Sequence, residues 1–268
     1  MSRTPAVANM FYPGETGALK KQLDSFISPI SQPKEVIAAI SPHAGYVYSG
    51  GVAGTVFSQI SIPETAIILG PNHRGIGASV AIQASGSWDM PLGPVQINKE
   101  LAGQILDLLG NKVKDDSQAH AMEHSIEVQI PFLQALKADI NIVPICVSHK
   151  SYEACDEIGQ ALAKVVQEYD KKVLLVASTD MTHYESRETA QAKDKLAIDR
   201  ILALDPKGLY NTVSQQGISM CGVMPTTMIL TACKALGATK AELVQYATSG
   251  DITGDYTQVV AYAGFIIY

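Results

Sequence analysis

The stretch Val36-Ile37-Ala38-Ala39-Ile40-Ser41-Pro42-His43-Ala44-Gly45 decides the fold class of this chain. Its apolar half predicts a buried strand, and its second half places a histidine between a proline and a glycine just beyond the strand end. The pattern recurs, because apolar runs at 66–69 and 173–177 are followed by His73 and His183. In open α/β sheets, ligands bind beyond the carboxyl ends of the strands. Three histidines that lie at that edge predict a metal site or an acid–base site.

Strand-like and helix-like segments alternate along the 268 residues. The predicted strands are 35–40, 66–69, 79–83, 140–147, 172–177, 243–247 and 258–267. The predicted helices are 15–26, 50–60, 98–109, 124–136, 152–169, 187–203, 206–216 and 224–236. This alternation predicts an α/β fold with a mostly parallel or mixed central sheet and helices on both faces. The length and the lack of a linker-like segment predict a single domain over residues 1–268.

The composition argues against several classes of protein. Hydrophobic residues make up 47% of the chain and charged residues 17%, which is typical of a folded core. The formal net charge is -6 and no run of lysine and arginine occurs, so nucleic acid is not an expected partner. No apolar stretch approaches the roughly 20 residues that span a bilayer, and the start does not resemble a signal peptide. We therefore expect no membrane association and a cytoplasmic location.

His43 and His73 are the first candidate metal ligands. Each has a proline shortly before it and a glycine two residues after it, so stiff backbone holds the histidine where a strand ends. Either histidine alone is equally typical of a core residue that bonds a backbone carbonyl. The repetition of the same local pattern favours shared ligation.

Cys221 is the candidate third ligand. It lies just before the predicted helix at 224–236, where the positive potential of a helix N-terminus stabilises a thiolate. The alternative is an inert buried thiol, and Cys146, Cys155 and Cys233 fit that description. Two imidazoles and one anionic ligand resemble an oxygen-activating Fe(II) centre, although a thiolate also suits copper or zinc.

Asp180 and His183 are candidate catalytic residues. On a turn, their spacing puts both side chains on one side, with His183 as a base and Asp180 orienting it or reaching the metal. The alternative is that Asp180 caps the next helix and His183 lies on the surface. Glu123 and Glu127 would share one face of the predicted helix. The alternatives are that this face lies near the site or that it is exposed to solvent. His120 and His149 are interpreted as structural or surface residues.

Taken together, several segments resemble the Memo family, whose prokaryotic members are called AmmeMemoRadiSam system protein B. The matching segments are Phe11-Tyr12-Pro13, Ser41-Pro42-His43-Ala44-Gly45-Tyr46, Leu69-Gly70-Pro71-Asn72-His73, Glu123-His124-Ser125-Ile126-Glu127, Ser178-Thr179-Asp180-Met181-Thr182-His183 and Cys221-Gly222. That family is similar to the class III extradiol dioxygenases, which use non-haem Fe(II). The resemblance implies a LigB-like dioxygenase fold around a vestibule and partners from the AmmeMemoRadiSam system.

The resemblance also implies roles for individual residues. It assigns the metal to His43, His73 and Cys221, where Cys221 replaces a glutamate of the dioxygenases, and it assigns the catalytic base to His183. A metal protein with redox or oxygenase-type chemistry is the leading hypothesis. The alternatives are a non-catalytic module that binds a small molecule or peptide, and a zinc hydrolase with Glu123 or Asp180 as base. The pocket residues expected in these cases are Phe11, Tyr12, Tyr46, Tyr48, Glu123 and His124.

Overall fold

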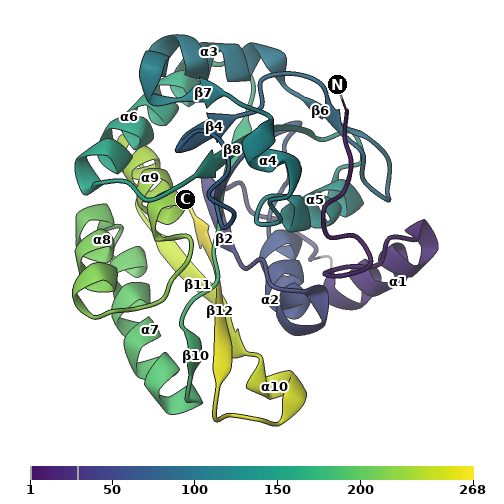
Figure 1. Ribbon diagram of the computed structural model, residues 1–268, viewed down its shortest axis with the longest axis vertical. Coiled ribbons are helices and arrows are strands. Elements are labelled where there is room, and N and C mark those ends of the chain that lie inside the picture. Colours follow the sequence, from purple (N-terminus) through teal and green to yellow (C-terminus); the bar gives the residue numbers. More distant parts are fainter. Residues whose placement is uncertain (1, 29) are drawn as a thin grey trace.

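Parallel strands form the middle of the sheet in the computed structural model, which describes residues 2–28 and 30–268 (Figure 1). They run side by side in the order β8 (Asn141–Val147), β3 (Thr65–Pro71), β9 (Val173–Ser178) and β2 (Ala38–Ser41). Nearly every residue in them is buried, which explains their continuous apolar sequences. Because the strands are parallel, their carboxyl ends lie at one edge of the sheet.

Antiparallel strands extend the sheet beyond β2. β12 (Val259–Ile267) pairs antiparallel with β2, with β11 (Ala241–Thr248) and with β10 (His183–Glu185). Beyond β8 lie short strands: β6 (Val95–Ile97), β4 (Val80–Ile82), β5 (Ser87–Trp88), β1 (Ser2–Arg3) and β7 (Lys114–Asp115). The sheet is therefore mixed, which confirms the predicted fold class.

Helices cover both faces of the sheet, as predicted. One group consists of α3 (Lys99–Leu109), α6 (Tyr152–Glu168), α7 (Arg187–Leu202), α8 (Pro206–Gln215) and α9 (Val223–Ala235). The other consists of α1 (Thr16–Phe26), α2 (Tyr46–Ser58) and α5 (Ile130–Leu136). Short helical turns are η1 (Gly110–Lys112), α4 (Gln118–Ala121), η2 (Glu127–Gln129) and α10 (Gly250–Thr253). Within the described ranges, no helix combines the length and apolarity that crossing a membrane requires.

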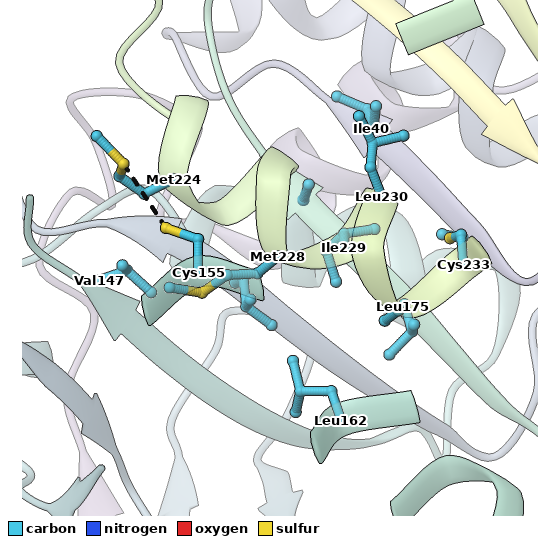
Figure 2. Packing of buried hydrophobic residues seen from close by; sticks show 14 of the residues in the cluster. Ile40, Val147, Cys155, Leu162, Leu175, Met224, Met228, Ile229, Leu230 and Cys233 are labelled. Carbon is cyan, nitrogen blue, oxygen red and sulfur yellow. Dashed lines mark hydrogen bonds between the residues drawn. The ribbon is translucent and has the colours of Figure 1, made fainter. Parts of the chain in front are cut away.

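Alternate residues of the central strands enter two separate cores, because successive side chains of a strand point to opposite faces. Ile40, Leu69 and Leu175 enter the core beneath α6 and α9, whereas Ala39, Ile68 and Val176 enter the core beneath α2 and α5. Figure 2 shows the first core, where Met224, Met228, Ile229 and Leu230 of α9 lie close to Leu162 and Cys155 of α6 and to the strand residues Ile40 and Leu175. This packing holds α9, and the loop before it, against the sheet.

Glycines let α2 approach α1 closely. A Cβ added at Gly54 would lie 2.5 Å from the backbone oxygen of Phe26, and one added at Gly50 would lie 2.5 Å from the ring of Phe26. Gly51 has open space around it. The tightest contacts of Gly50 and Gly54 are therefore with α1.

The helix predicted over 124–136 is wrong in its first half. Residues 124–126 form an irregular turn, followed by a 3-10 turn and then α5. The carboxylate of Glu123 accepts the backbone N–H groups of His124 and Ser125, which competes with helix formation. Pro131 lies in the first turn of α5, where it is tolerated, and produces no kink inside a longer helix.

Candidate functional site

The predicted metal ligands lie together at the carboxyl edge of the sheet. His43 follows β2, His73 follows β3, and Cys221 lies in the loop before α9. One ligand atom from each of these three residues lies within 4.8 Å of those of the other two, and Cys221 Sγ is 3.2 Å from His43 Nε2. A Cβ at Gly222 would lie 2.4 Å from the backbone oxygen of Ser178, so only glycine allows the cysteine loop to come this close.

The hydrogen bonds of His43 determine which ring nitrogen is free. Ser178 Oγ donates its one proton to the carbonyl of Ser125 at 2.5 Å and accepts a bond from Gln129 Nε2 at 2.8 Å. It can therefore only accept from His43 Nδ1, which lies 2.9 Å away. The proton is thus on Nδ1, and Nε2 presents a lone pair beside Cys221. Burial, and then the neighbouring histidines, lower the pKa of His43 well below its usual value, so the ring is neutral.

His73 is oriented in the same way by a carboxylate. Its Nδ1 lies 2.9 Å from Glu123 Oε1, which can only accept when ionised, so Nε2 of His73 is again the free atom. Burial raises the pKa of Glu123, but hydrogen bonds from His73 and the backbone outweigh that effect and lower it to about 2. Glu123 also accepts the backbone N–H of His73 at 2.6 Å. The carboxylate is fully engaged and has no capacity left to act as a free base.

Aromatic rings surround the two candidate ligands His43 and His73. His124 stacks on His73 with ring centroids 4.6 Å apart, and Phe11 packs on His124 at 4.7 Å. Burial lowers the pKa of His124 to about 4, so this ring is also neutral. Tyr46, expected to line the pocket, is instead 2% exposed in the core and donates its hydroxyl proton to a backbone carbonyl. Tyr12 is likewise buried at 3%.

Asp180 contacts both His43 and Cys221. Its Oδ1 accepts the backbone N–H of His43 at 2.8 Å, and its own N–H donates to Cys221 Sγ at 3.2 Å. Its Oδ2 lies 4.0 Å from His43 Nε2. Burial raises the pKa of this carboxyl to about 6. The alternative reading of Asp180 as a helix cap is wrong, because Ser186 caps α7.

His183 lies at the start of β10, in a strand, so Asp180 and His183 are not on one turn as expected. Its backbone N–H donates to Ser219 Oγ at 2.7 Å, which ties it to the loop that carries Cys221. Its Nδ1 is buried and has no hydrogen-bond partner among the residues that the structure describes.

Cys221 differs from the expectation of a stabilised thiolate. Its position before α9 is confirmed, but burial, and then the charge of Asp180, raise the pKa of the thiol far above its usual value. A cation between the imidazoles and the sulfur is the charge that would offset this burial. Two imidazoles that are bound to protein acceptors through Nδ1, beside a buried thiol, form a donor set that fits a metal ion.

A buried arginine holds the loop that carries Glu123 and was not identified from the sequence. Arg3 Nη1 lies 2.7 Å from Glu127 Oε2, and the guanidinium also donates to the carbonyls of His120 and Glu123 at 2.7 Å each. Its charge centre lies 4.1 Å over the ring of Trp88. Glu127 therefore faces the N-terminal segment and not the metal ligands.

Two other histidines have the roles expected of them. His120 is fully buried, with Nε2 3.2 Å from the carbonyl of Ala81, and His149 is exposed. Ser178 and Gln129, which hold the ring of His43, were not identified from the sequence. Only the position of Ser178 at the end of a predicted strand pointed to the site.

Comparisons with known proteins agree with the motifs. The family model described as "Memo-like protein" matches residues 3–266. The chain belongs to the Memo family. MEMO1 family proteins from Methanopyrus kandleri and Aquifex aeolicus are each 42% identical to it, over 99% and 98% of both chains respectively.

A solved structure also shows the fold of this Memo-family chain. An uncharacterized protein from Escherichia coli K12 matches with a TM-score of 0.56 at 17% sequence identity, over 85% of this chain and 99% of that chain. At this identity the likeness concerns the fold alone.

Proposed function

We propose that this Memo-family protein binds one redox-active metal ion through His43, His73 and Cys221 and uses it in oxygenase-type or other redox chemistry. One observation carries the proposal: both histidines are bound to a protein acceptor through Nδ1, and one ligand atom each of His43, His73 and Cys221 lies within 4.8 Å of the other two. Metal-binding histidines in proteins are held in this way by a partner on the other ring nitrogen.

The donor set favours Fe(II) as the first candidate, with copper or zinc as alternatives. Two imidazoles and one anionic ligand leave open positions on an Fe(II) ion, and the soft sulfur also suits copper and zinc. A bound ion of this kind supplies Lewis acidity or electron transfer to a ligand in its open positions. The four cysteines are free thiols in the structure, which is consistent with the proposed cytoplasmic setting.

The protein's own residues then have separate tasks. Glu123 and Ser178 fix the tautomers of the two histidines, and Asp180 holds His43 and Cys221 in place. His183 is the proton carrier, because imidazole is the most common acid–base group in catalysis and its Nδ1 is buried without a hydrogen-bond partner among the described residues. The ligand is a small molecule or a peptide, or is supplied by another component of the AmmeMemoRadiSam system.

Metal analysis of anaerobically purified protein tests the proposal. We expect about one equivalent of metal in the wild type and none in a His43→Ala/His73→Ala/Cys221→Ala variant. His149→Ala and Cys233→Ala are matched controls that should retain the metal, since one alters an exposed histidine and the other a core cysteine. Full metal content in the triple variant would refute the assignment.

The absorption spectrum separates the candidate metals. Sulfur-ligated Cu(II) or Fe(III) gives visible charge-transfer bands, whereas zinc gives none. A colourless zinc protein with esterase or amidase activity would replace redox chemistry with hydrolysis, and the base would then be Asp180 or His183, because Glu123 is fully engaged.

A non-catalytic binding module is the second candidate. It is favoured by exposed apolar side chains that adjoin site residues in the chain: Met10 (76% exposed), Met122 (54%) and Tyr184 (73%). Titration calorimetry with phosphopeptides tests it. Binding that survives in the metal-site triple variant, without turnover in the wild type, would favour this function.

A further inference from the structure

The strand β11 lies at an edge of the sheet. It pairs with β12 along its length, and within the described residues no strand lies on its other side. No turn or loop of the described chain bonds the backbone of residues 243–247 either. From Leu243 to Thr248 the strand carries no charged side chain. A long uncharged edge with unpaired N–H and C=O groups is a template for pairing with another strand.

A bulge puts two apolar side chains of β11 on the same face. The pairing with β12 shifts register between Leu243 and Gln245, and the extra residue, Val244, packs against the core on the α2 side. In a regular strand, residues three apart would point to opposite faces. Here Leu243 and Tyr246 instead line one groove beside α7. The bulge therefore gives the edge strand an apolar face on the α7 side.

α7 and β11 border a groove at the surface of the molecule. Its volume is about 370 Å³, and its apolar lining consists of Ile198 and Leu202 of α7 and of Leu243 and Tyr246 of β11. Leu202 and Leu243 are 39% and 38% exposed. Exposed apolar side chains that gather in one groove on a strand edge are typical of an interaction surface.

The polar residues of the groove indicate which partner fits. They are Gln191, Lys195 and Asp199 of α7, which are four residues apart and therefore lie along one face of the helix. Lys195 Nζ lies 2.7 Å from Asp199 Oδ2, and both side chains are exposed. A face with one cation and one anion is self-complementary around a two-fold axis, because the lysine of each copy then meets the aspartate of the other. A second copy of this chain therefore fits the groove.

We propose that this face is the interface of a homodimer, in which β11 pairs antiparallel with β11 of a second copy and the two α7 helices pack side by side. A two-fold axis through the middle of the groove brings Leu243 of each copy opposite Tyr246 of the other. It also brings Lys195 opposite Asp199. Aromatic–aliphatic and opposite-charge pairs stabilise such contacts. The pairing extends the sheet across both copies and gives the backbone groups of each edge their hydrogen-bond partners.

Sedimentation velocity of the purified protein at micromolar concentrations tests the proposal. We expect the wild type to sediment as a dimer. Leu243→Lys should weaken the dimer by about a hundredfold or more, because it places like charges together across the interface. Ile252→Lys is the matched control: it alters an exposed apolar residue of α10 outside the groove and should remain dimeric. Far-ultraviolet circular dichroism checks that both variants are folded. A monomeric wild type would overturn the proposal.

A mixing experiment tests whether the two α7 helices meet. Lys195→Asp leaves only anions on this face of α7 and Asp199→Lys leaves only cations, so each variant alone should dimerise about tenfold more weakly than the wild type. Equal amounts of the two variants, mixed together, should recover the wild-type affinity as a heterodimer. Weaker self-association without recovery in the mixture would overturn the packing of the helices. A dimer that survives Leu243→Lys and both charge variants would place the interface elsewhere and overturn the proposal as a whole.

Discussion

Replacement of Arg3 by methionine tests the buried ion pair that holds the Glu123 loop. The side chains of Arg3 and Glu127 are only 6% and 0% exposed, and the other hydrogen-bond donors to the Glu127 carboxylate are the N–H groups of Ala6 and Val7 and the hydroxyl of Tyr12. Removing one partner of a buried pair leaves an uncompensated charge and costs about 3–5 kcal/mol. For a chain of this size that corresponds to a fall in Tm of roughly 6–20 °C.

Urea denaturation of Arg3→Met measures this loss directly, provided that the transition is reversible. Arg3→Met/Glu127→Gln should recover part of the stability, because it removes both charges. Lys172→Met is a matched control: it breaks the exposed Lys172–Glu35 pair and should leave the denaturation midpoint unchanged. If Arg3→Met unfolds within about 1 kcal/mol of the wild type, the buried-pair reasoning is wrong. Arg3→Met should also bind metal more weakly, because Arg3 donates to the backbone carbonyl of Glu123, whose carboxylate orients His73.

Three further predictions concern packing, ligand orientation and pH. Gly54→Ala should destabilise the protein, because its Cβ meets the α1 backbone at 2.5 Å, whereas Gly51→Ala, with open space, should stabilise it by about 0.5–1 kcal/mol in thermal or urea unfolding. Ser178→Ala removes the acceptor of His43 Nδ1 and should lower metal affinity by about 10- to 100-fold, as measured by competition with a chelator. An unchanged affinity would contradict the proposed tautomer of His43. Burial lowers the pKa of His120 to about 4, below its value in the unfolded chain. The contribution of His120 to stability should therefore be greatest above about pH 6.5 and should fall as the pH drops towards 4. In His120→Asn the free energy of unfolding should fall less steeply over this pH range, and an equally steep fall would contradict the prediction.

The parts of the site that follow strands were predictable from the sequence. Apolar runs fix β2, β3 and β9, and parallel strands bring their carboxyl ends to one edge, so His43 and His73 were expected to meet. The position of Cys221 before α9 was visible as a pattern, but its distance to the imidazoles depends on how the Gly222 loop packs on Ser178. That contact joins segments far apart in the chain and has no local signature.

The errors arose where tertiary contacts overrule local periodicity. The spacing of Glu123 and Glu127 fits one face of a helix, yet each carboxylate binds a different distant partner, His73 or Arg3, and the helix is replaced by a turn. Tyr46 was expected in the pocket because it follows the His43 motif. At the start of α2 its ring points into the core, and the orientation of a side chain at a helix start is set by the neighbouring helices.

The placement of β12 constrains the order in which the molecule can be built. β12 follows both of its partners in the sequence: it pairs with β2, which leads to His43, and with β10, which begins at His183. On the ribosome, a nascent chain that has not yet emerged through Ile267 therefore lacks the strand that joins these two segments. Such pairing between distant segments slows folding. The candidate metal site is consequently completed only after β12 has been made, so an ion has no finished binding site to enter before then.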